Sequence, residues 1–376
     1  MKLTSNERIM RVFKNKSYDR PVFKLWGAIP GQKLLHADYK CVVERAAIVT
    51  DIFSGANSPF NIYAGQKSGD FFTTETRPTD DPLWVDMITT CNTPKGRLQS
   101  IERMSTIGDP SYTLEHMIKE PEDIKRMLSL PYTPYPVNLL PYQTECARIN
   151  DRGIVMFSLD NPIYALGRLT GSENLALFSY DCRELISEAI CIFSQRIHEH
   201  VKAVLAQGIA PVFAWVGPEI CIPPLMAVRD FEEFVFKAEK PYCDTIHNAN
   251  GYVWLHCHGK VRNFIERYIQ MGIDVLNPLE PSKNKNGDVV MSEIVAHFGS
   301  RIGFEGNIEI QDIILADTST LKALIHECVE AGAVSGRFIL CPSTGFMEFS
   351  HPQPRCIENL MTYLDYGFEL MEAQRR

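Results

Sequence analysis

The sequence lacks the features that mark several classes of protein. Its eleven cysteines include no Cys-x-x-Cys pair, which argues against a disulfide scaffold, a zinc knuckle and an iron–sulfur ferredoxin motif. No uninterrupted apolar stretch approaches the roughly 18 residues that a membrane-spanning helix needs. The formal net charge is −8 and the lysines and arginines are scattered singly, so we expect no nucleic-acid partner.

The N-terminus and the scattered cysteines indicate a reducing compartment. Residues 1–7 lack the apolar core of a secretion signal, so we expect a cytoplasmic protein that does not bind a membrane. In that compartment cysteine usually serves as a small buried apolar residue. We expect this of the eight cysteines outside any motif: Cys41, Cys91, Cys146, Cys182, Cys191, Cys243, Cys328 and Cys356.

The pattern of apolar segments predicts an α/β protein, a (β/α)8 TIM barrel. The chain has 376 residues and 45% hydrophobic content, which suits one such barrel with an added N-terminal segment. From about residue 153, short apolar runs alternate with longer amphipathic ones, as in parallel strands joined by helices. We expect strands at Ile154–Leu159, Ala210–Val216, Tyr252–Cys257, Val275–Leu279, Arg301–Phe304 and Phe338–Cys341, and helices near 183–208, 229–249, 260–271, 288–298, 316–332 and 354–374.

The first part of the chain is expected to extend this barrel with a helix and a β-hairpin. Thr4 and Glu7 have the spacing of a capping box, which predicts an N-terminal helix. The run Val22–Trp26 predicts the first barrel strand, and Leu83–Met104, with turn residues in its middle, predicts a hairpin. We therefore predict a single domain over residues 1–376, with the extension at 1–150 and the main repeats at 151–376.

The tripeptide His256-Cys257-His258 closes one predicted strand. Successive strand side chains point to opposite faces, so His256 and His258 share one face while Cys257 points away. Two neutral imidazoles on one wall provide half of a metal site. The alternative is one buried, hydrogen-bonded histidine beside a histidine at the surface.

Other polar residues also follow the predicted strands, and in TIM barrels the active site lies at these carboxyl ends. Glu219 and Cys341 are candidates to complete a metal site with the histidines. Asp160, Glu305 and Asn307 are candidates to orient a substrate or to deliver a proton. The full set of polar residues at these ends is Asp160, Glu219, Asn277, Glu280, Glu305, Asn307 and Cys341.

Each candidate also has a structural alternative. Glu219 could cap a helix or pair with a cation at the rim. Glu305 could be a structural carboxylate, and Cys341 could simply end its strand. Asp160 could cap the helix that follows it, and Asn307 could hold its own loop in place.

The order of several short motifs resembles the uroporphyrinogen decarboxylase superfamily. This superfamily includes decarboxylases and zinc-dependent methyltransferases that work with corrinoid proteins. The resemblance implies a TIM barrel and favours a homodimer. It rests on Glu7-Arg8, Asp19-Arg20-Pro21, Phe231-Glu232-Glu233-Phe234, His256-x-His258-Gly259, Gly306-Asn307-Ile308, Pro342-Ser343-Thr344-Gly345, Pro354 and Glu358-Asn359.

The decarboxylase branch is known for an N-terminal arginine-rich loop that binds the acidic side chains of a tetrapyrrole. The corresponding stretch here, Lys24–Gly31, contains no arginine. Several propionates require several fixed cations, and one lysine does not replace bidentate guanidinium groups. A metal-free lyase acting on an aromatic or tetrapyrrolic acid is therefore the second hypothesis.

The methyltransferase branch resembles the chain more closely but differs at the sulfur ligands. That branch binds zinc through His-x-Cys and a later cysteine, whereas this chain has His258 and Thr344 at those places. Cys341 or Glu219 could replace the missing ligands, or the site could hold no metal. We expect a zinc site made from Glu219, His256, His258 and Cys341.

These expectations combine into a reaction. Zinc with nitrogen and oxygen ligands is a stronger Lewis acid than zinc with thiolates. We therefore expect it to assist transfer of a methyl group from a small methylated substrate, most plausibly an ether, to the cobalt of a corrinoid (cobalamin). The chain has no Asp-x-His-x-x-Gly cobalt-binding motif, so the corrinoid would be bound to a separate carrier protein. A third hypothesis is a barrel that has lost catalysis and serves as a scaffold for a partner.

Overall fold

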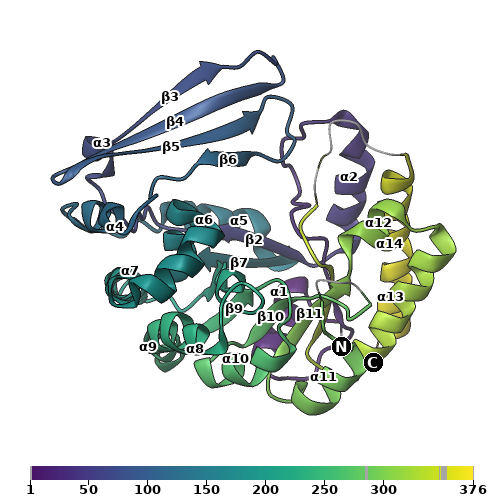
Figure 1. Ribbon diagram of the computed structural model, residues 1–376. Coiled ribbons are helices and arrows are strands. Elements are labelled where there is room, and N and C mark those ends of the chain that lie inside the picture. Colours follow the sequence, from purple (N-terminus) through teal and green to yellow (C-terminus); the bar gives the residue numbers. More distant parts are fainter. Residues whose placement is uncertain (1, 284–286, 347, 349–353, 376) are drawn as a thin grey trace.

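Eight parallel strands form the barrel that the sequence predicts (Figure 1). The computed structural model describes residues 2–283, 287–346, 348 and 354–375. The strands are hydrogen-bonded in the order β1-β12-β11-β10-β9-β8-β7-β2. Their bounds are β1 (Val22–Phe23), β2 (Ile52–Ala56), β7 (Gly153–Ser158), β8 (Val212–Val216), β9 (Tyr252–His256), β10 (Val275–Leu279), β11 (Gly303–Ile308) and β12 (Phe338–Pro342).

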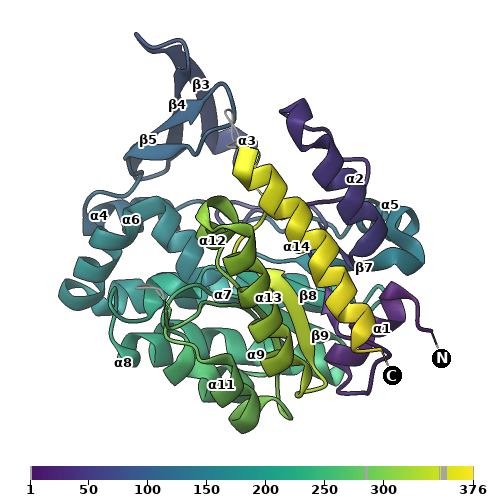
Figure 2. The ribbon, with the colours of Figure 1, turned by 90° about the vertical axis from the view of Figure 1, so that its right-hand side faces the viewer.

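Helices cover the outside of this barrel (Figures 1 and 2). The expected helix at 229–249 is interrupted by a π-helical turn at Glu232–Phe236. The helices are α1 (Ser5–Phe13), α2 (Lys40–Val49), α3 (Ser68–Phe71), α4 (Pro121–Leu128), α5 (Leu140–Ile149), α6 (Pro162–Asp181), α7 (Arg183–Leu205), α8 (Val228–Phe231), α9 (Lys237–Asn248), α10 (Ile265–Met271), α11 (Met291–Phe298), α12 (Ile310–Leu315), α13 (Thr318–Ala333) and α14 (Pro354–Ala373).

Alternate residues of the strands fill the barrel interior. Helix α1 closes the amino-terminal end of the barrel, where its apolar residues pack against this interior layer. The predicted capping box at Thr4 and Glu7 is present at the start of α1. The interior cluster consists of Ile9, Val12, Phe13, Val22, Phe53, Ile154, Met156, Val212, Ala214, Trp254, Val275 and Ile339.

Several elements differ from the sequence prediction, among them helices α2, α3, α5 and α12, which were not predicted. Strand β1 spans two residues, fewer than the predicted Val22–Trp26. Strand β2 was not predicted, because its sequence Ile-Phe-Ser-Gly-Ala is short and ends in residues with little preference for strands. Helix α6 was also not predicted. It bends at Gly171, where φ is 74°, so its apolar residues do not follow one continuous helical period.

An insert between β2 and β7 forms a separate four-stranded antiparallel sheet with the order β3-β4-β5-β6. This sheet stands over one end of the barrel (Figures 1 and 2). The predicted hairpin is confirmed as β4 and β5, which pair along their whole length, whereas the two outer strands were not predicted. The four strands are β3 (Phe72–Pro78), β4 (Trp84–Thr93), β5 (Gly96–Ser105) and β6 (Tyr112–Glu115).

The prediction for the cysteines is confirmed in part. Cys91, Cys243, Cys328 and Cys356 are buried, and Cys146 and Cys182 are partly buried. Cys41 and Cys191 are exposed, because they occupy positions on α2 and α7 that face solvent. Within the described part of the chain, no helix is long and apolar enough to span a membrane.

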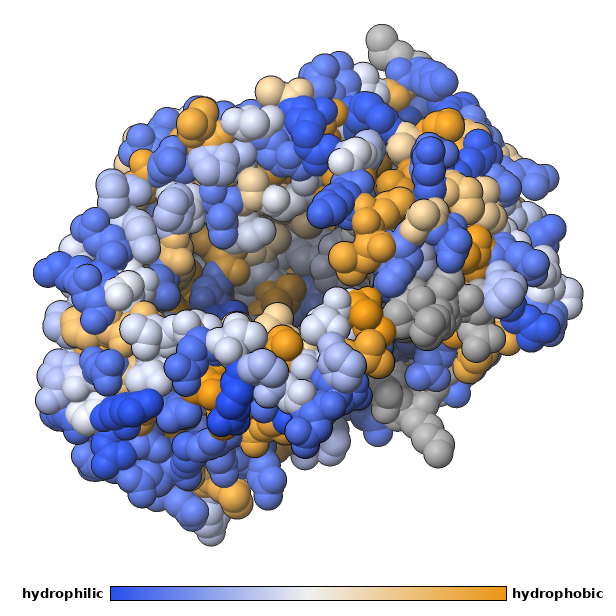
Figure 3. Space-filling model, turned by 90° about the horizontal axis from the view of Figure 1, so that it is seen from above, coloured by the Kyte–Doolittle hydropathy of each residue, from blue (hydrophilic) through white to orange (hydrophobic). Residues whose placement is uncertain are grey.

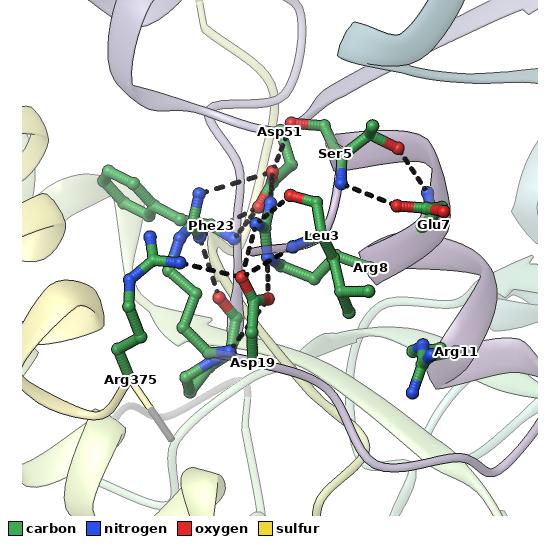
Figure 4. Close-up of polar contacts among 12 residues, drawn as sticks. Leu3, Ser5, Glu7, Arg8, Arg11, Asp19, Phe23, Asp51 and Arg375 are labelled. Carbon is green, nitrogen blue, oxygen red and sulfur yellow. Dashed lines mark hydrogen bonds and ion pairs between the residues drawn. The ribbon is translucent and has the colours of Figure 1, made fainter. Parts of the chain in front are cut away.

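A carboxylate joins the two strands at the ends of the sheet order. The Asp51 backbone N–H donates to the Phe23 carbonyl at 2.7 Å, and the Phe23 N–H donates to the Asp51 carboxylate at 3.0 Å. Arg8 also binds this carboxylate, at 2.6 Å (Figure 4), and Arg20 binds it at 3.1 Å. Asp51 therefore connects β1 and β2 at the point where the barrel closes.

The same cluster fixes both ends of the chain. Arg8 binds Asp19 at 2.8 Å, and Arg375, which follows α14, binds Asp19 at 2.8 Å (Figure 4). Burial of Asp19 opposes its ionisation, but the hydrogen bond and charge of Arg8 outweigh this effect and lower the pKa of Asp19 to about 2. The cluster thus links α1 and the C-terminal end of the chain to the first strands.

Replacing Asp51 tests the closure of the barrel. Asp51→Asn removes the buried anion that Arg8 and Arg20 share and leaves Arg8 with Asp19 alone, and we expect the free energy of unfolding to fall by about 3–5 kcal/mol. Urea denaturation measures this change. The matched control is Asp244→Asn, which removes an exposed ion pair with Lys240 and should change stability little. Equal effects of the two substitutions would contradict the role of Asp51.

Candidate active site at the carboxyl end of the barrel

The structure brings His256 and His258 together at the end of β9. Their ring centroids lie 4.5 Å apart with an interplanar angle of 86°. His256 is 6% exposed and lies in the barrel interior, whereas His258 is only partly buried. Cys257 points away from them and accepts a hydrogen bond from the Tyr268 hydroxyl at 3.1 Å. The two imidazoles therefore share one face, as the strand pattern predicts.

A hydrogen-bonded chain beneath His256 determines which of its nitrogens carries the proton. The Lys24 ammonium and the Trp254 indole N–H donate to the Glu305 carboxylate at 2.6 and 2.8 Å. The Asn277 amide nitrogen donates to the same carboxylate at 2.9 Å. The Asn277 amide oxygen therefore faces His256 Nδ1 at 2.6 Å. Because that oxygen only accepts, Nδ1 must donate.

The consequence for His256 is a bare Nε2 lone pair. A neutral imidazole that carries its proton on Nδ1 has an unprotonated Nε2. Burial, together with the neighbouring His258, lowers the pKa of His256 to about 4, so the ring is neutral near pH 7. A metal-ligating histidine is commonly held in this way by a partner at its other nitrogen.

His258 is held by a carboxylate in a similar manner. Its Nδ1 lies 2.9 Å from Glu280 Oε1, and Glu280 Oε2 accepts from the Gly259 backbone N–H at 2.7 Å. Burial opposes protonation, but the hydrogen bond and charge of Glu280 outweigh it and raise the pKa of His258. Among the described residues, no hydrogen bond is made by Nε2 of either histidine.

Glu219 lies in a tight turn at Pro218–Cys221, directly after β8. The turn requires glycine at position 217, where φ is 116° and a Cβ would lie 2.3 Å from the Tyr164 ring. Glu219 Oε2 is buried and has no hydrogen-bond partner among the residues that the structure describes. Burial raises the pKa of this carboxyl group. An unpaired buried oxygen is costly unless a ligand or water uses it.

The donor chemistry fits a zinc ion in part. Two imidazole Nε2 atoms and the Glu219 oxygen are suitable ligands for zinc. Cys341 is different: it is fully buried near Glu305, and burial raises the pKa of its thiol well above the usual value. Within the described ranges, no three His, Cys, Asp or Glu side chains are grouped so that they could hold a metal ion. The four expected ligands therefore do not form a preassembled centre.

The expected catalytic residues take different places. Asp160 forms an ion pair with Arg168 at 2.9 Å, and Asn161, rather than Asp160, caps α6. Glu305 lies beneath His256 in the buried chain described above. Asn307 borders a cavity of about 610 Å³ near α11 and α13, and its backbone N–H donates to Cys328 Sγ at 3.2 Å.

Little in the sequence indicated that Lys24 belongs to the site. It is a single lysine in an apolar run, and the structure buries it almost completely, 1% exposed, against Glu305. Its ammonium also lies 4.3 Å from the ring centroid of Phe53 and 5.0 Å from that of Trp254. A lone charge in a predicted interior strand was the available signal, because such a charge needs a buried partner.

A second buried carboxyl group ties the ends of β7 and β8 together outside the barrel. Glu239 on α9 is fully buried and accepts hydrogen bonds from the Trp215 indole at 2.7 Å and from the Asn161 amide at 2.5 Å. Burial raises the pKa of Glu239 to about 8. Because Asn161 follows Asp160 and Trp215 lies four residues before Glu219, Glu239 supports two segments of the site.

The carboxyl end of the barrel is accessible from outside. Seen from the side of the insert sheet, the surface is hollowed near its centre (Figure 3). The fold and the residues at this end define a TIM-barrel protein with a histidine pair at the usual place for an active site.

The family follows from comparison with known proteins. Residues 112–354, more than half of the chain, match the model of the family described as uroporphyrinogen decarboxylase (URO-D). The chain belongs to this family, which confirms the resemblance seen in the short motifs. No protein with a curated description matches the sequence.

One of the similar solved structures supports the fold. A methyltransferase from Methanosarcina mazei is similar over 98% of this chain and 99% of that chain, with 14% identity and a TM-score of 0.61. The YdhT protein from Bacillus subtilis is similar over 97% of this chain and 94% of that chain, with 9% identity and a TM-score of 0.43.

NMR can test which ring nitrogen of His256 carries the proton. In protein labelled with 15N-histidine, we expect Nδ1 of His256 to show a protonated shift and Nε2 an unprotonated one at neutral pH. Asn277→Leu removes the acceptor and should produce a mixture of the two tautomers. A spectrum of His256→Gln assigns the signals. A proton on Nε2 in the wild type would contradict the hydrogen-bonded chain.

Glu239 gives a prediction for the pH dependence of stability. The folded pKa of about 8 lies above the ordinary value of 4.5 for a glutamate, so the stability that this group contributes is complete below pH 4.5. Stability should fall by about 1.4 kcal/mol per pH unit as the pH rises from 4.5 towards 8. Glu239→Gln should remove this slope. Denaturation curves measured between pH 5 and 8 check it, and parallel profiles for the two proteins would refute it.

Proposed function

We propose that this protein is a methyltransferase that moves a methyl group from a small methylated donor, most plausibly an ether, to the cobalt of a corrinoid bound to a partner protein. The observation that carries the proposal is the histidine pair at the carboxyl end of β9. Each ring is held through Nδ1, which leaves both Nε2 atoms free to bind a ligand. The similarity in fold to a solved structure named as a methyltransferase also supports this proposal.

The placement of Lys24 argues against decarboxylation of a tetrapyrrole. Lys24 is the only cation in the stretch Lys24–Gly31, and its ammonium is already paired with Glu305 inside the barrel. Arg168 at the rim is paired with Asp160. A substrate with several carboxylates would therefore find few unpaired cations along this part of the site.

In this proposal His256, His258 and Glu219 hold zinc. When bound there, zinc supplies a Lewis acid that stabilises the negative charge developing on the heteroatom that loses the methyl group. Asn277 and Glu280 orient the two imidazoles, and Glu305 acts through Asn277 rather than on the substrate. Cys341 has no role as a ligand here, because it lies with Glu305 in the interior.

Asp160 is the candidate that remains for contact with the donor. It lies at the end of β7 and is fixed by Arg168, whose guanidinium carbon lies 5.4 Å from the Tyr164 ring centroid. The cobalt must approach the methyl carbon in line, so the partner has to dock over the barrel end. The hollow at this end in Figure 3 is compatible with such an approach.

The reaction can be measured directly. Purified protein is mixed with zinc, a reduced corrinoid protein and methyl ethers, methylamines or methyl thioethers, and methyl-cobalt is followed by its absorption. We expect signal with at least one ether donor and no release of carbon dioxide from uroporphyrinogen. No methyl-cobalt with any donor would refute the proposal, and carbon dioxide release without metal would favour the lyase.

Metal content tests the ligands independently of activity. We expect the wild type to bind about one zinc per chain, and His258→Ala and Glu219→Ala to weaken zinc binding at least about 10-fold. Cys341→Ser and His326→Ala, the latter at an exposed position on α13, should retain the metal. Equal zinc in all five proteins would refute the ligand set.

A further inference from the structure

A second cavity lies outside the barrel, between the segment 132–137 and helix α7. Its volume is about 440 Å³, within the range of small-molecule sites. His200 of α7 forms part of its wall and lies between Phe60 and Phe157, at ring-centroid distances of 4.7 and 6.1 Å. Phe157 belongs to the core outside β7, not to the interior cluster, so this cavity is separate from the histidine pair.

His200 has no hydrogen-bond partner among the residues described. The residue is 7% exposed, and burial lowers its pKa to about 4. It is therefore neutral near pH 7, with one N–H donor and one bare nitrogen. A polar ligand in the cavity can therefore form a hydrogen bond with one of these two nitrogens.

Arg196, one turn earlier on α7, also borders the cavity with unused donors. Its Nη1 donates to the carbonyls of Ile62 and Tyr63 at 2.7 and 2.9 Å, and its guanidinium lies 4.2 Å from the Tyr132 ring centroid. Over the described ranges, Nε and Nη2 donate to no protein group, and no carboxylate lies within 4 Å of this guanidinium. Nε and Nη2 form one edge of the guanidinium group, and a carboxylate can bind both of them at once.

The remaining wall is mostly aromatic and apolar, with one acidic residue and one amide, Gln207. Tyr135, Pro134 and Ala203 line the space. Glu199 also borders it, but this residue is exposed and its carboxylate accepts a hydrogen bond from Gln195 at 3.0 Å. The cavity thus offers an unpaired cation, an unpaired imidazole and flat apolar walls.

We propose that this cavity is a binding site for a small aromatic carboxylate. The carboxylate would bind the free edge of Arg196, and the ring would lie among the aromatic side chains with a polar substituent at His200. The observations that carry this inference are the unpaired Arg196 guanidinium and the unpartnered His200 ring, which border one cavity. The site does not depend on the proposed methyl transfer.

Calorimetric titration with benzoate and 4-hydroxybenzoate tests the proposal on the full-length protein. We expect both to bind, and the hydroxylated acid to bind more tightly because it can reach His200. Cyclohexanecarboxylate and inorganic phosphate should bind at least 10-fold more weakly. Hydrogen exchange should show protection of residues 131–137 and 196–203 when benzoate is present.

The variants are chosen to keep the fold. Arg196→Lys retains a donor for the two backbone carbonyls but loses the fork, and Ala203→Phe fills the cavity without touching a polar group. Each should weaken benzoate at least 10-fold, and His200→Phe should abolish the advantage of the hydroxyl group. The matched control is Lys202→Gln, at an exposed position on the same helix, which should leave binding unchanged.

Three results would overturn the inference. These are no heat of binding with millimolar benzoate, unchanged affinity in both Arg196→Lys and Ala203→Phe, and phosphate binding as tight as benzoate. The last would indicate a site that recognises charge alone. None of these results bears on methyl transfer, so this inference and the proposed function fail independently.

Discussion

The buried ion pair between Lys24 and Glu305 is the interaction on which the candidate site depends. It joins β1 to β11 across the barrel interior, and Glu305 also receives donors from Trp254 on β9 and Asn277 on β10. Four strands are thereby fixed at one level, directly beneath His256. Removing an ion pair from water is costly. In return, this pair orients Asn277, and Asn277 orients His256.

The barrel uses a second buried ionic cluster for a different purpose. Asp51, with Arg8 and Arg20, adds side-chain contacts to the backbone hydrogen bond from Asp51 to Phe23, where β1 and β2, the end strands of the hydrogen-bonded order, meet. This cluster lies near the chain ends, whereas the Lys24–Glu305 pair lies below the site. The motifs Glu7-Arg8 and Asp19-Arg20-Pro21, which resemble the family, are therefore explained by closure of the barrel and not by catalysis.

The histidine pair differs from the thiolate ligands of the methyltransferases it resembles, and the surroundings match this difference. The neutral His256 is held at Nδ1 by an amide and His258 is held at Nδ1 by a carboxylate, an arrangement that would suit a bound cation. A cysteine in the same interior, Cys341, is kept as a buried thiol beside Glu305. In the proposed methyl transfer, this chemistry would suit an oxygen leaving group better than a sulfur nucleophile.

The periodicity of the sequence predicted most of the barrel, because a strand buried by helices must be apolar and short. Periodicity did not predict β2, because serine and glycine weaken the strand pattern there. It also did not predict α6, because Gly171 interrupts the helical period. Alternation along β9 was also sufficient to place His256 and His258 on one face, since the side-chain period of a strand is fixed.

What the sequence by itself determined is the fold class, the family and the histidine pair, all of which depend on local spacing or on the order of motifs. The tertiary structure alone decided which partner each residue has. Lys24 and Glu305 are 281 residues apart along the chain, and only closure of the barrel brings them into contact. For the same reason Cys341 lies beside Glu305: this contact depends on how β11 and β12 pack side by side, which no local pattern encodes.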